Sequence, residues 1–203
     1  MTYLLSNWPT VLRLFAEHLG ISLVALLLSA LIALPLGWLL HRSPRLAGPV
    51  IGVLGILYTV PSIALMILLI PLLGLNARAV IVALVIYAQV ILLRNVLAGL
   101  AGVDPAVLES ARGMGMNTRQ VALWVQFPLA LPVILAGARI AAVTVVAIAT
   151  IGARFGAGGL GVLLFEGIAQ AGRMDKIVIG AALAALLALA FDRALLAVER
   201  KLA

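Results

Sequence analysis

The feature that most constrains the fold of this chain is a set of five mostly apolar stretches. Each has roughly the 20 residues that a membrane-spanning helix needs. Only 10% of the 203 residues are charged, whereas soluble domains carry about 25%. Too little polar surface therefore exists to cover a water-soluble globule. We expect an all-α membrane protein, a single transmembrane domain over residues 1–203, with spans at Ile21–Leu40, Pro49–Leu73, Ala79–Leu97, Val133–Ala153 and Ile177–Val198.

Three details refine these spans. Thr10–Leu19 has apolar residues at helical spacing, so it either lies on the membrane or extends the first span. Pro61 removes a helix hydrogen bond and predicts a kink in the second span. Charged residues near one end of the third and fifth spans should lie at an interface or face protein, namely Arg94, Asp192 and Arg193.

Positive charge predicts the orientation of the spans, because cytoplasmic loops carry an excess of Lys and Arg. Five spans place the termini on opposite sides. Of the 14 basic residues, nine fall on the side of the C-terminus. We therefore expect the N-terminus outside and the C-terminus in the cytoplasm. The nine are Arg42, Arg45, Arg94, Arg112, Arg119, Arg139, Arg193, Arg200 and Lys201, and the other side has Arg13, Arg78, Arg154, Arg173 and Lys176.

The least hydrophobic long stretch lies between the third and fourth spans, over about residues 98–132, on the predicted cytoplasmic side. Asp104-Pro105 is typical of a helix start, since Asp caps free N–H groups and Pro suits the first position. Val103 and Leu108 have the spacing of a hydrophobic staple. Gly113 and Gly115 should end this helix.

A second short helix is expected after the glycines. Asn117 and Gln120 provide a weaker cap for it. Pro128 and Pro132 should then turn the chain back into the bilayer. One face of the first helix collects the apolar residues Val107, Leu108, Ala111 and Met114. Because so short a helix is marginal alone in water, it should pack against its own chain or a partner.

This stretch resembles a loop of the membrane permeases of binding-protein-dependent ABC importers, which reads E-A-A, three residues, G, nine residues and I-x-L-P. Here Glu109-Ser110-Ala111 is followed by Gly115 and by Val125-Gln126-Phe127-Pro128 at matching spacing. Ser110, Val125 and Phe127 depart mildly from the pattern. The resemblance implies a type I permease fold, whose short helix docks on a separate ATPase, with coupling residues Asp104, Glu109, Ala111, Arg112 and Gly115.

Further motifs resemble the glycine betaine/carnitine/choline permeases more narrowly: Tyr58–Ser62, Arg94-Asn95, Gly102–Pro105, Ala111–Met116 and Phe127–Val133. The likeness runs from about Gly20 to Ala190. It implies transport of a small osmoprotectant, a second permease chain, identical or different, and an extracytoplasmic solute-binding protein. A methionine- or other amino-acid-type permease is the alternative within the family. A secondary transporter or channel that needs no ATPase is the alternative outside it, although no ionisable residue lies clearly mid-span.

Two local patterns suggest other functions, and we set both aside. Two short helices joined by a glycine turn can form a DNA-binding unit, but here they lie between spans and the second helix is apolar. Gly156–Gly161 fits the dinucleotide pattern G-x-G-x-x-G, yet the run before it is far too long for a strand. We interpret these glycines as a tight turn that allows close helix packing at the outer end of the fourth span. The resemblance to the permeases also implies a part in an outer gate.

No residues group into a catalytic or metal site. The chain has no cysteine and two histidines, His18 and His41, far apart in the sequence. No phosphate-binding G-x-x-x-x-G-K-[ST] occurs, so ATP must be bound by another subunit. We expect neither an enzyme nor a cofactor in this chain, nor binding to nucleic acid.

Polar residues within apolar runs are the candidates for a solute path between two permease chains, although each has packing as its simpler explanation. Tyr58 and Tyr87 could offer π faces to a quaternary ammonium group, or anchor and pack instead. The candidates are Tyr58, Thr59, Pro61, Ser62, Gln89, Asn95, Thr144 and Thr150.

Overall fold

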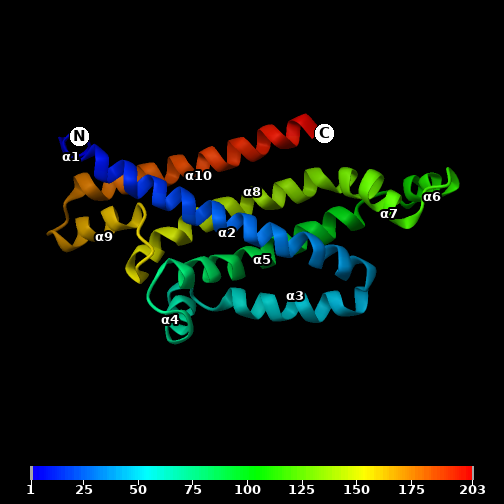
Figure 1. The fold of residues 1–203 in the computed structure, drawn as a ribbon, viewed down its shortest axis with the longest axis horizontal. Helices are drawn as coiled ribbons and strands as arrows, with labels where there is room; N and C mark the ends of the chain where they lie inside the picture. The colour runs from blue at the N-terminus through cyan, green and yellow to red at the C-terminus, as the bar shows by residue number, and fades with distance from the viewer. Residues whose placement is uncertain (1, 203) are drawn as a thin grey trace.

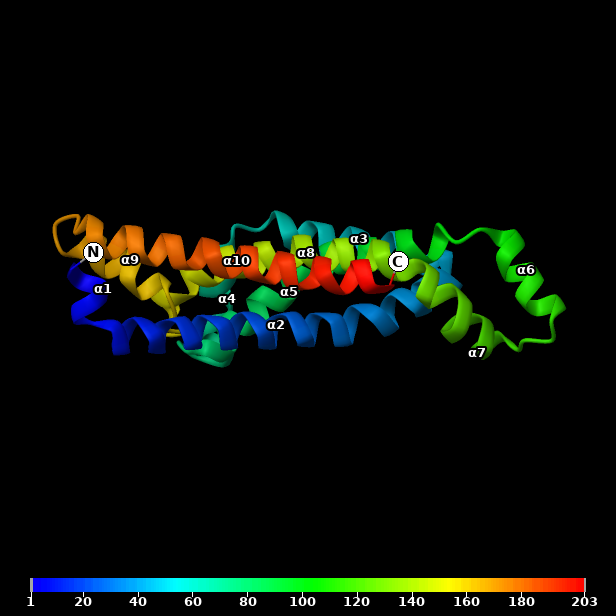
Figure 2. The same ribbon diagram turned by 90° about the horizontal axis from the view of Figure 1, so that it is seen from above.

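The computed structural model describes residues 2–202, which form an elongated bundle of helices without a strand in that range (Figure 1). Short α6 and α7 project from one end of the bundle, and α1 and α9 lie at the other (Figure 2). The elements are α1 Thr2–Ser6, α2 Trp8–Arg42, α3 Pro44–Thr59, α4 Ser62–Leu73, α5 Ala77–Ala101, α6 Pro105–Gly113, α7 Thr118–Gln120, the π-helix η1 Val121–Gln126, α8 Phe127–Gly152, the 3₁₀-helix η2 Ala153–Phe155, α9 Gly161–Ala169 and α10 Met174–Leu202.

Four helical stretches are long and apolar enough to cross a membrane, and a bent pair makes a fifth if it forms one span, in agreement with the expected bundle of about five spans. Thr10–Leu19 lies within α2 and therefore extends the first span. The four stretches are Trp8–Arg42, Ala77–Ala101, Thr118–Phe155 and Met174–Lys201, and the bent pair is α3 with α4.

The second span is broken rather than continuous, which corrects the expected single helix. Its halves α3 and α4 meet at 99°. Val60 is extended (φ −64°, ψ 128°) because a residue before proline is disfavoured in the helical region. Pro61 has no N–H to donate, and its own carbonyl accepts the first bond of α4, from Leu65 N–H at 3.0 Å. The kink predicted at Pro61 is confirmed.

The fourth span also differs from expectation. Pro128 and Pro132 do not turn the chain, since α7, η1, α8 and η2 form one continuous helical stretch from Thr118 to Phe155. Pro128 falls in the first turn of α8, immediately after the π-helix. Prolines are tolerated in membrane helices where neighbouring helices and local widening satisfy the freed backbone groups. The prediction that these prolines end the helix is wrong.

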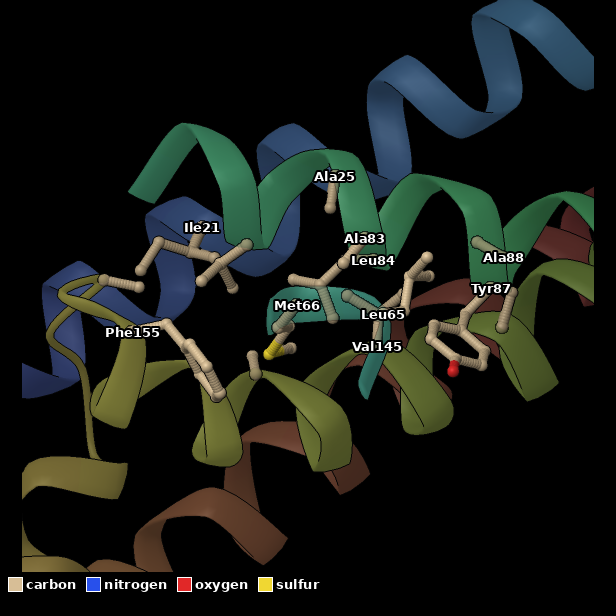
Figure 3. Close-up of a cluster of buried hydrophobic side chains, with 14 of the residues drawn as sticks. Ile21, Ala25, Leu65, Met66, Ala83, Leu84, Tyr87, Ala88, Val145 and Phe155 are labelled. Atoms are coloured by element: carbon tan, nitrogen blue, oxygen red, sulfur yellow. The ribbon is translucent and has the colours of Figure 1, made fainter. Parts of the chain in front are cut away.

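The core lies where α5 passes between α2 and α8, and Leu65 and Met66 of α4 extend into it (Figure 3). Small side chains permit close approach: Ala25, Ala83 and Ala141 are fully buried. A Cβ atom at Gly137 would overlap the Cβ of Asn95 on α5. Small residues at such contacts are typical of membrane bundles, where helix association depends on van der Waals packing.

An ion-paired cluster joins α8 to α10. The Arg139 guanidinium donates to Asp192 Oδ1 at 2.8 Å and to Glu199 Oε2 at 3.2 Å. The expectation that Asp192 faces protein is therefore confirmed. Arg193 is 70% exposed, and Arg94 is exposed near Gly55 of α3.

Candidate functional site

The segment Gly102–Asn117, with the short helix α6 inside it, projects beyond the long helices (Figure 2). This segment is shorter than the expected stretch 98–132, because α5 continues to Ala101 at one end and the helical stretch of the fourth span begins at Thr118 at the other. Asp104 Oδ1 accepts the N–H of Ala106 at 2.8 Å, which confirms the predicted cap. Helix α6 ends at Gly113, and Gly115 adopts φ +87°, a conformation that favours glycine.

A second cap begins the return path. The side chain of Asn117 accepts the N–H of Gln120 at 3.0 Å, and the side chain of Gln120 accepts the N–H of Asn117 at 2.8 Å. This reciprocal pair is a capping box, as the sequence predicted. Local caps therefore fix the chain at the start of α6, through Asp104, and at the start of α7, through Asn117 and Gln120.

Only a small part of α6 packs against its own chain. Ala111 is its single buried residue, at 2% exposure. The predicted staple is confirmed, because Val103 and Leu108 join one apolar cluster with Leu100 and Ile134. These contacts attach one side of α6 to the end of the α5–α8 pair.

The remaining surface of α6 faces outward. Val107 is 40% and Met114 is 74% exposed, so the expected apolar face is divided between core and surface. Glu109 and Arg112 are exposed, and neither forms an ion pair with any residue in 2–202. A helix with one anchored side, exposed apolar groups and two free charges is suited to bind another protein.

A polar network lies beneath α6 that the sequence analysis did not identify. The amide of Gln126, on the π-helix, donates to the Leu100 carbonyl at 3.1 Å and lies 3.0 Å from His41 Nε2. Trp38 stacks on His41 with ring centroids 6.3 Å apart, and it meets Phe127 in a tilted arrangement with centroids 5.3 Å apart. The network joins α2, α5 and η1. Gln126 was recognisable only as a polar residue in an apolar run.

Comparison with known proteins identifies this arrangement. Residues 25–203 match the family described as "Binding-protein-dependent transport system inner membrane component". The chain belongs to this family. The permease is therefore a multi-pass membrane protein, and its capped segment corresponds in position and spacing to the loop that the sequence analysis singled out.

Curated relatives match the permease over nearly its whole length. It is 43% identical to the carnitine transport permease OpuCB of Listeria monocytogenes, covering 100% of this chain and 92% of the relative. It is 39% identical to the choline transport system permease OpuBB of Bacillus subtilis, covering 98% and 92%. Among solved structures, an inward-facing MetNI methionine ABC transporter gives a TM-score of 0.86 at 25% identity, over 96% of each chain.

Four of the predicted solute-path residues lie together at the break between α3 and α4: Tyr58, Thr59, Pro61 and Ser62. Tyr58 meets Tyr87 edge to face, with centroids 5.7 Å apart. The Tyr87 hydroxyl donates to the Val60 carbonyl, which the break leaves without a helical donor. The Thr59 hydroxyl donates to Ile56 O at 2.7 Å, within its own helix.

The other four lie at helix contacts or bond back to their own helices. Gln89 is 5% exposed, and its amide donates to Ser29 O on α2 at 3.1 Å. Asn95 faces Gly137 on α8. The hydroxyls of Thr144 and Thr150 donate to carbonyls one turn earlier, at 2.9 and 2.7 Å. The structure does not bring these four together with the break.

The glycines after α8 lie at the end of the bundle opposite α6 (Figure 1). Gly156, Gly158 and Gly159 all have positive φ, which confirms the tight turn. The N–H of Gly159 donates to Glu17 Oε2 at 3.0 Å, and a Cβ at Gly159 would lie 2.9 Å from His18 Nδ1. The turn therefore packs directly on α2, as the interpretation of close helix packing requires.

Proposed function

We propose that this permease forms the membrane path of an ATP-driven importer for a small osmoprotectant such as glycine betaine, carnitine or choline. Support comes from two relatives at 43% and 39% identity, which are named for transport of carnitine and choline. These solutes share a quaternary ammonium group, and aromatic faces attract such cations. Tyr58, which is 41% exposed beside the break, offers the aromatic face suited to that role, and the buried Tyr87 supports its ring edge to face.

We propose that the end carrying α6 faces the cytoplasm. The C-terminal side has nine of the 14 basic residues, and an excess of Lys and Arg is typical of cytoplasmic loops. The glycine turn at Gly156–Gly161 then lies on the outer side, where an extracytoplasmic binding protein delivers the solute. A second permease chain, identical or different, completes the wall around the path.

The observation that carries the proposed mechanism is the exposure of α6. Ala111 anchors the helix to the bundle, while Glu109 and Arg112 are free to pair with a separate ATPase. That ATPase binds the ATP, and its closure moves α6. Asp104 and Gly115 keep the helix short and rigid by fixing its two ends. Motion therefore passes to α5 and α8, the helices on either side of the segment.

We place the solute path at Tyr58, Thr59, Pro61 and Ser62, because the first N–H groups of α4 have no side-chain cap at the break and can bond a passing polar solute. Thr144 and Thr150 border the path only if the hydroxyls leave their own helices. Gln89 and Asn95 act by positioning α5 against α2 and α8. The permease itself performs no catalysis and needs no cofactor.

Two substitutions in α6 and its turn test the coupling. Glu109→Lys reverses a free charge, and Gly115→Ala strains the backbone at φ +87° without a clash, since nothing lies within 4 Å. With the ATPase and binding protein in liposomes, both variants should lower solute-stimulated ATP hydrolysis at least about tenfold while the complex still inserts. Gly113→Ala is the matched control, because its Cβ also meets nothing within 4 Å.

Unchanged coupling in both variants contradicts the assignment of α6. Solute uptake by the permease alone, without the ATPase, contradicts the importer itself and favours a secondary transporter or channel. Uptake of methionine in place of betaine, carnitine and choline contradicts only the assignment of the solute, not the importer. Methionine is the alternative solute to test first, because the fold is similar to that of MetNI.

A further inference from the structure

A surface cavity of about 520 Å³ lies where the end of α2 meets α7 and η1, at the end of the bundle that carries α6. It is separate from the break between α3 and α4 and from the exposed face of α6. Its lining combines apolar residues with two arginines: Leu34, Pro35, Trp38, Arg42, Thr118, Arg119, Ala122, Leu123 and Phe127.

The apolar wall of this cavity continues along the membrane-spanning part of α2. Leu34 and Leu123, on opposite walls, are 37% and 62% exposed. One turn further into the span, Leu31 is 71% exposed. Trp124 beside the cavity is 75% exposed, and tryptophan is enriched at membrane–water interfaces. This apolar surface is therefore suited to contact lipid chains at the side of the cavity.

Each side of the cavity also contributes one arginine, Arg42 from α2 and Arg119 from α7, and neither has a counter-charge in the described part of the chain. Arg42 lies over Trp38, with 5.9 Å from its guanidinium carbon to the ring centroid. Neither Arg42 nor Arg119 is ion-paired with any residue in 2–202. No acidic residue lines the cavity. A second cavity of about 270 Å³ shares Trp38, Arg42 and Thr118 with it and adds Arg112, again without an acid.

We propose that this cavity binds an anionic phospholipid. The phosphate lies between Arg42 and Arg119, and the first carbons of an acyl chain lie against Leu34, Pro35 and Leu123. Basic pockets between membrane helices bind anionic headgroups in this way. The apolar walls favour a lipid over a free phosphate ion, since a soluble anion leaves those walls in water. The lipid joins α2 to η1, directly beneath the segment that contains α6.

Contact quenching by brominated lipids tests this site. The chain has three tryptophans, so Trp8→Phe with Trp124→Phe leaves Trp38 as the one reporter. The full-length variant, labelled with 5-hydroxytryptophan, is titrated in mixed micelles with phosphatidylglycerol or phosphatidylcholine that carry identical brominated chains. Trp38 should be quenched at a much lower fraction of phosphatidylglycerol than of phosphatidylcholine.

Charge variants assign that preference to the two arginines. Each basic residue near an anionic surface contributes about a fivefold preference. Arg42→Gln with Arg119→Gln should therefore reduce the preference by about 25-fold, whereas the two Lys substitutions should retain most of it. Arg45→Gln is the matched control, because Arg45 is exposed at the same end but does not line the cavity. This control should keep the full preference.

Four results overturn the proposal. Equal quenching by the two lipids, or a preference that survives in the double Gln variant, shows that the arginines select no headgroup. Relief of quenching by millimolar inorganic phosphate shows a site for soluble anions. Loss of quenching when the ATPase is added shows that protein covers the cavity. The 5-hydroxytryptophan signal of the permease can be read in that mixture, because it is excited where the ordinary tryptophans of the ATPase do not absorb.

Discussion

Helices α5 and α6 follow one another in the chain but are held in place by different means. Helix α5 is buried against α2, α8 and α4, with Ala83, Leu84 and Leu93 fully buried. Helix α6 buries only Ala111 and has its ends fixed by the Asp104 cap and by Gly115. The fold therefore depends on α5, whereas α6 is a locally specified unit attached to it.

This contrast predicts that stability and coupling respond to different residues. Changes around α5 should lower the free energy of unfolding. Changes on the exposed side of α6 should leave it nearly unchanged and alter only the response to a partner. Three substitutions, ordered by their expected effect on stability, examine that separation.

The largest loss of stability is expected from Gly137→Ala. The added Cβ would overlap the Cβ of Asn95, where α8 crosses α5, and neither backbone can move without disturbing the core. Overlap with three side-chain atoms of Asn95 should cost about 3 kcal/mol or more, at the upper end of the range for overpacking. Thermal unfolding in detergent, followed by helix content, measures the change.

Gly52→Ala on α3 is the matched control, because nothing lies within 4 Å of its Cβ. It should be neutral or slightly stabilising, since alanine favours a helix over glycine. Equal unfolding temperatures for the two variants would show that α5 and α8 are less closely packed than the structure indicates, and the contrast with α6 would disappear.

An intermediate loss is expected from Gly156→Ala, in the turn at the other end of α8. The position combines φ +76° with a Cβ 2.9 Å from the Leu75 carbonyl oxygen, a backbone atom that cannot rotate away. Gly172→Ala has φ +73° but nothing within 4 Å, so it carries the backbone strain alone, about 1–2 kcal/mol.

The difference between these two variants in the unfolding measurement isolates the contact. Gly156→Ala should be the less stable by about 1 kcal/mol, within the range for overpacking. If Gly172→Ala is equally destabilised, the contact at Gly156 adds nothing to the backbone strain. The turn at Gly156 is then held by its own conformation, like α6, and does not depend on packing against the bundle.

The same contrast explains which features were predictable from the sequence. The caps at Asp104 and Asn117 and the turn at Gly115 were predicted correctly, because their signals lie within a few residues. The break at Pro61 was predicted as a kink, but its 99° angle depends on how α3 and α4 pack against α5. Tyr87, 27 residues away, bonds the freed Val60 carbonyl, and no local pattern contains that contact.

Long-range packing also accounts for what the sequence could not reveal. Pro128 and Pro132 are strong local signals for a helix end, yet the π-helical turn before them and the neighbouring helices override that signal. The polar character of Gln89 and Asn95 was evident, but α5 is apolar on all sides, so the direction of each side chain was not. Family resemblance identified α6, whereas the joint between Gln126 and His41 required the fold.

The smallest change in stability is expected from Asp104→Ala, which removes the N-cap of α6. The N–H of Ala106 loses its acceptor, and a lost cap costs about 1 kcal/mol of local helix stability. Hydrogen exchange should therefore become about fivefold faster across α6, while the unfolding temperature of the bundle stays close to that of the unaltered chain. Ser110→Ala is the control in the same helix, because its hydroxyl only bonds back to Ala106 O and its loss leaves no donor unpaired. A fall in unfolding temperature as large as that of Gly137→Ala would mean that α6 is part of the core, and then its exposure could no longer support a role in binding the ATPase.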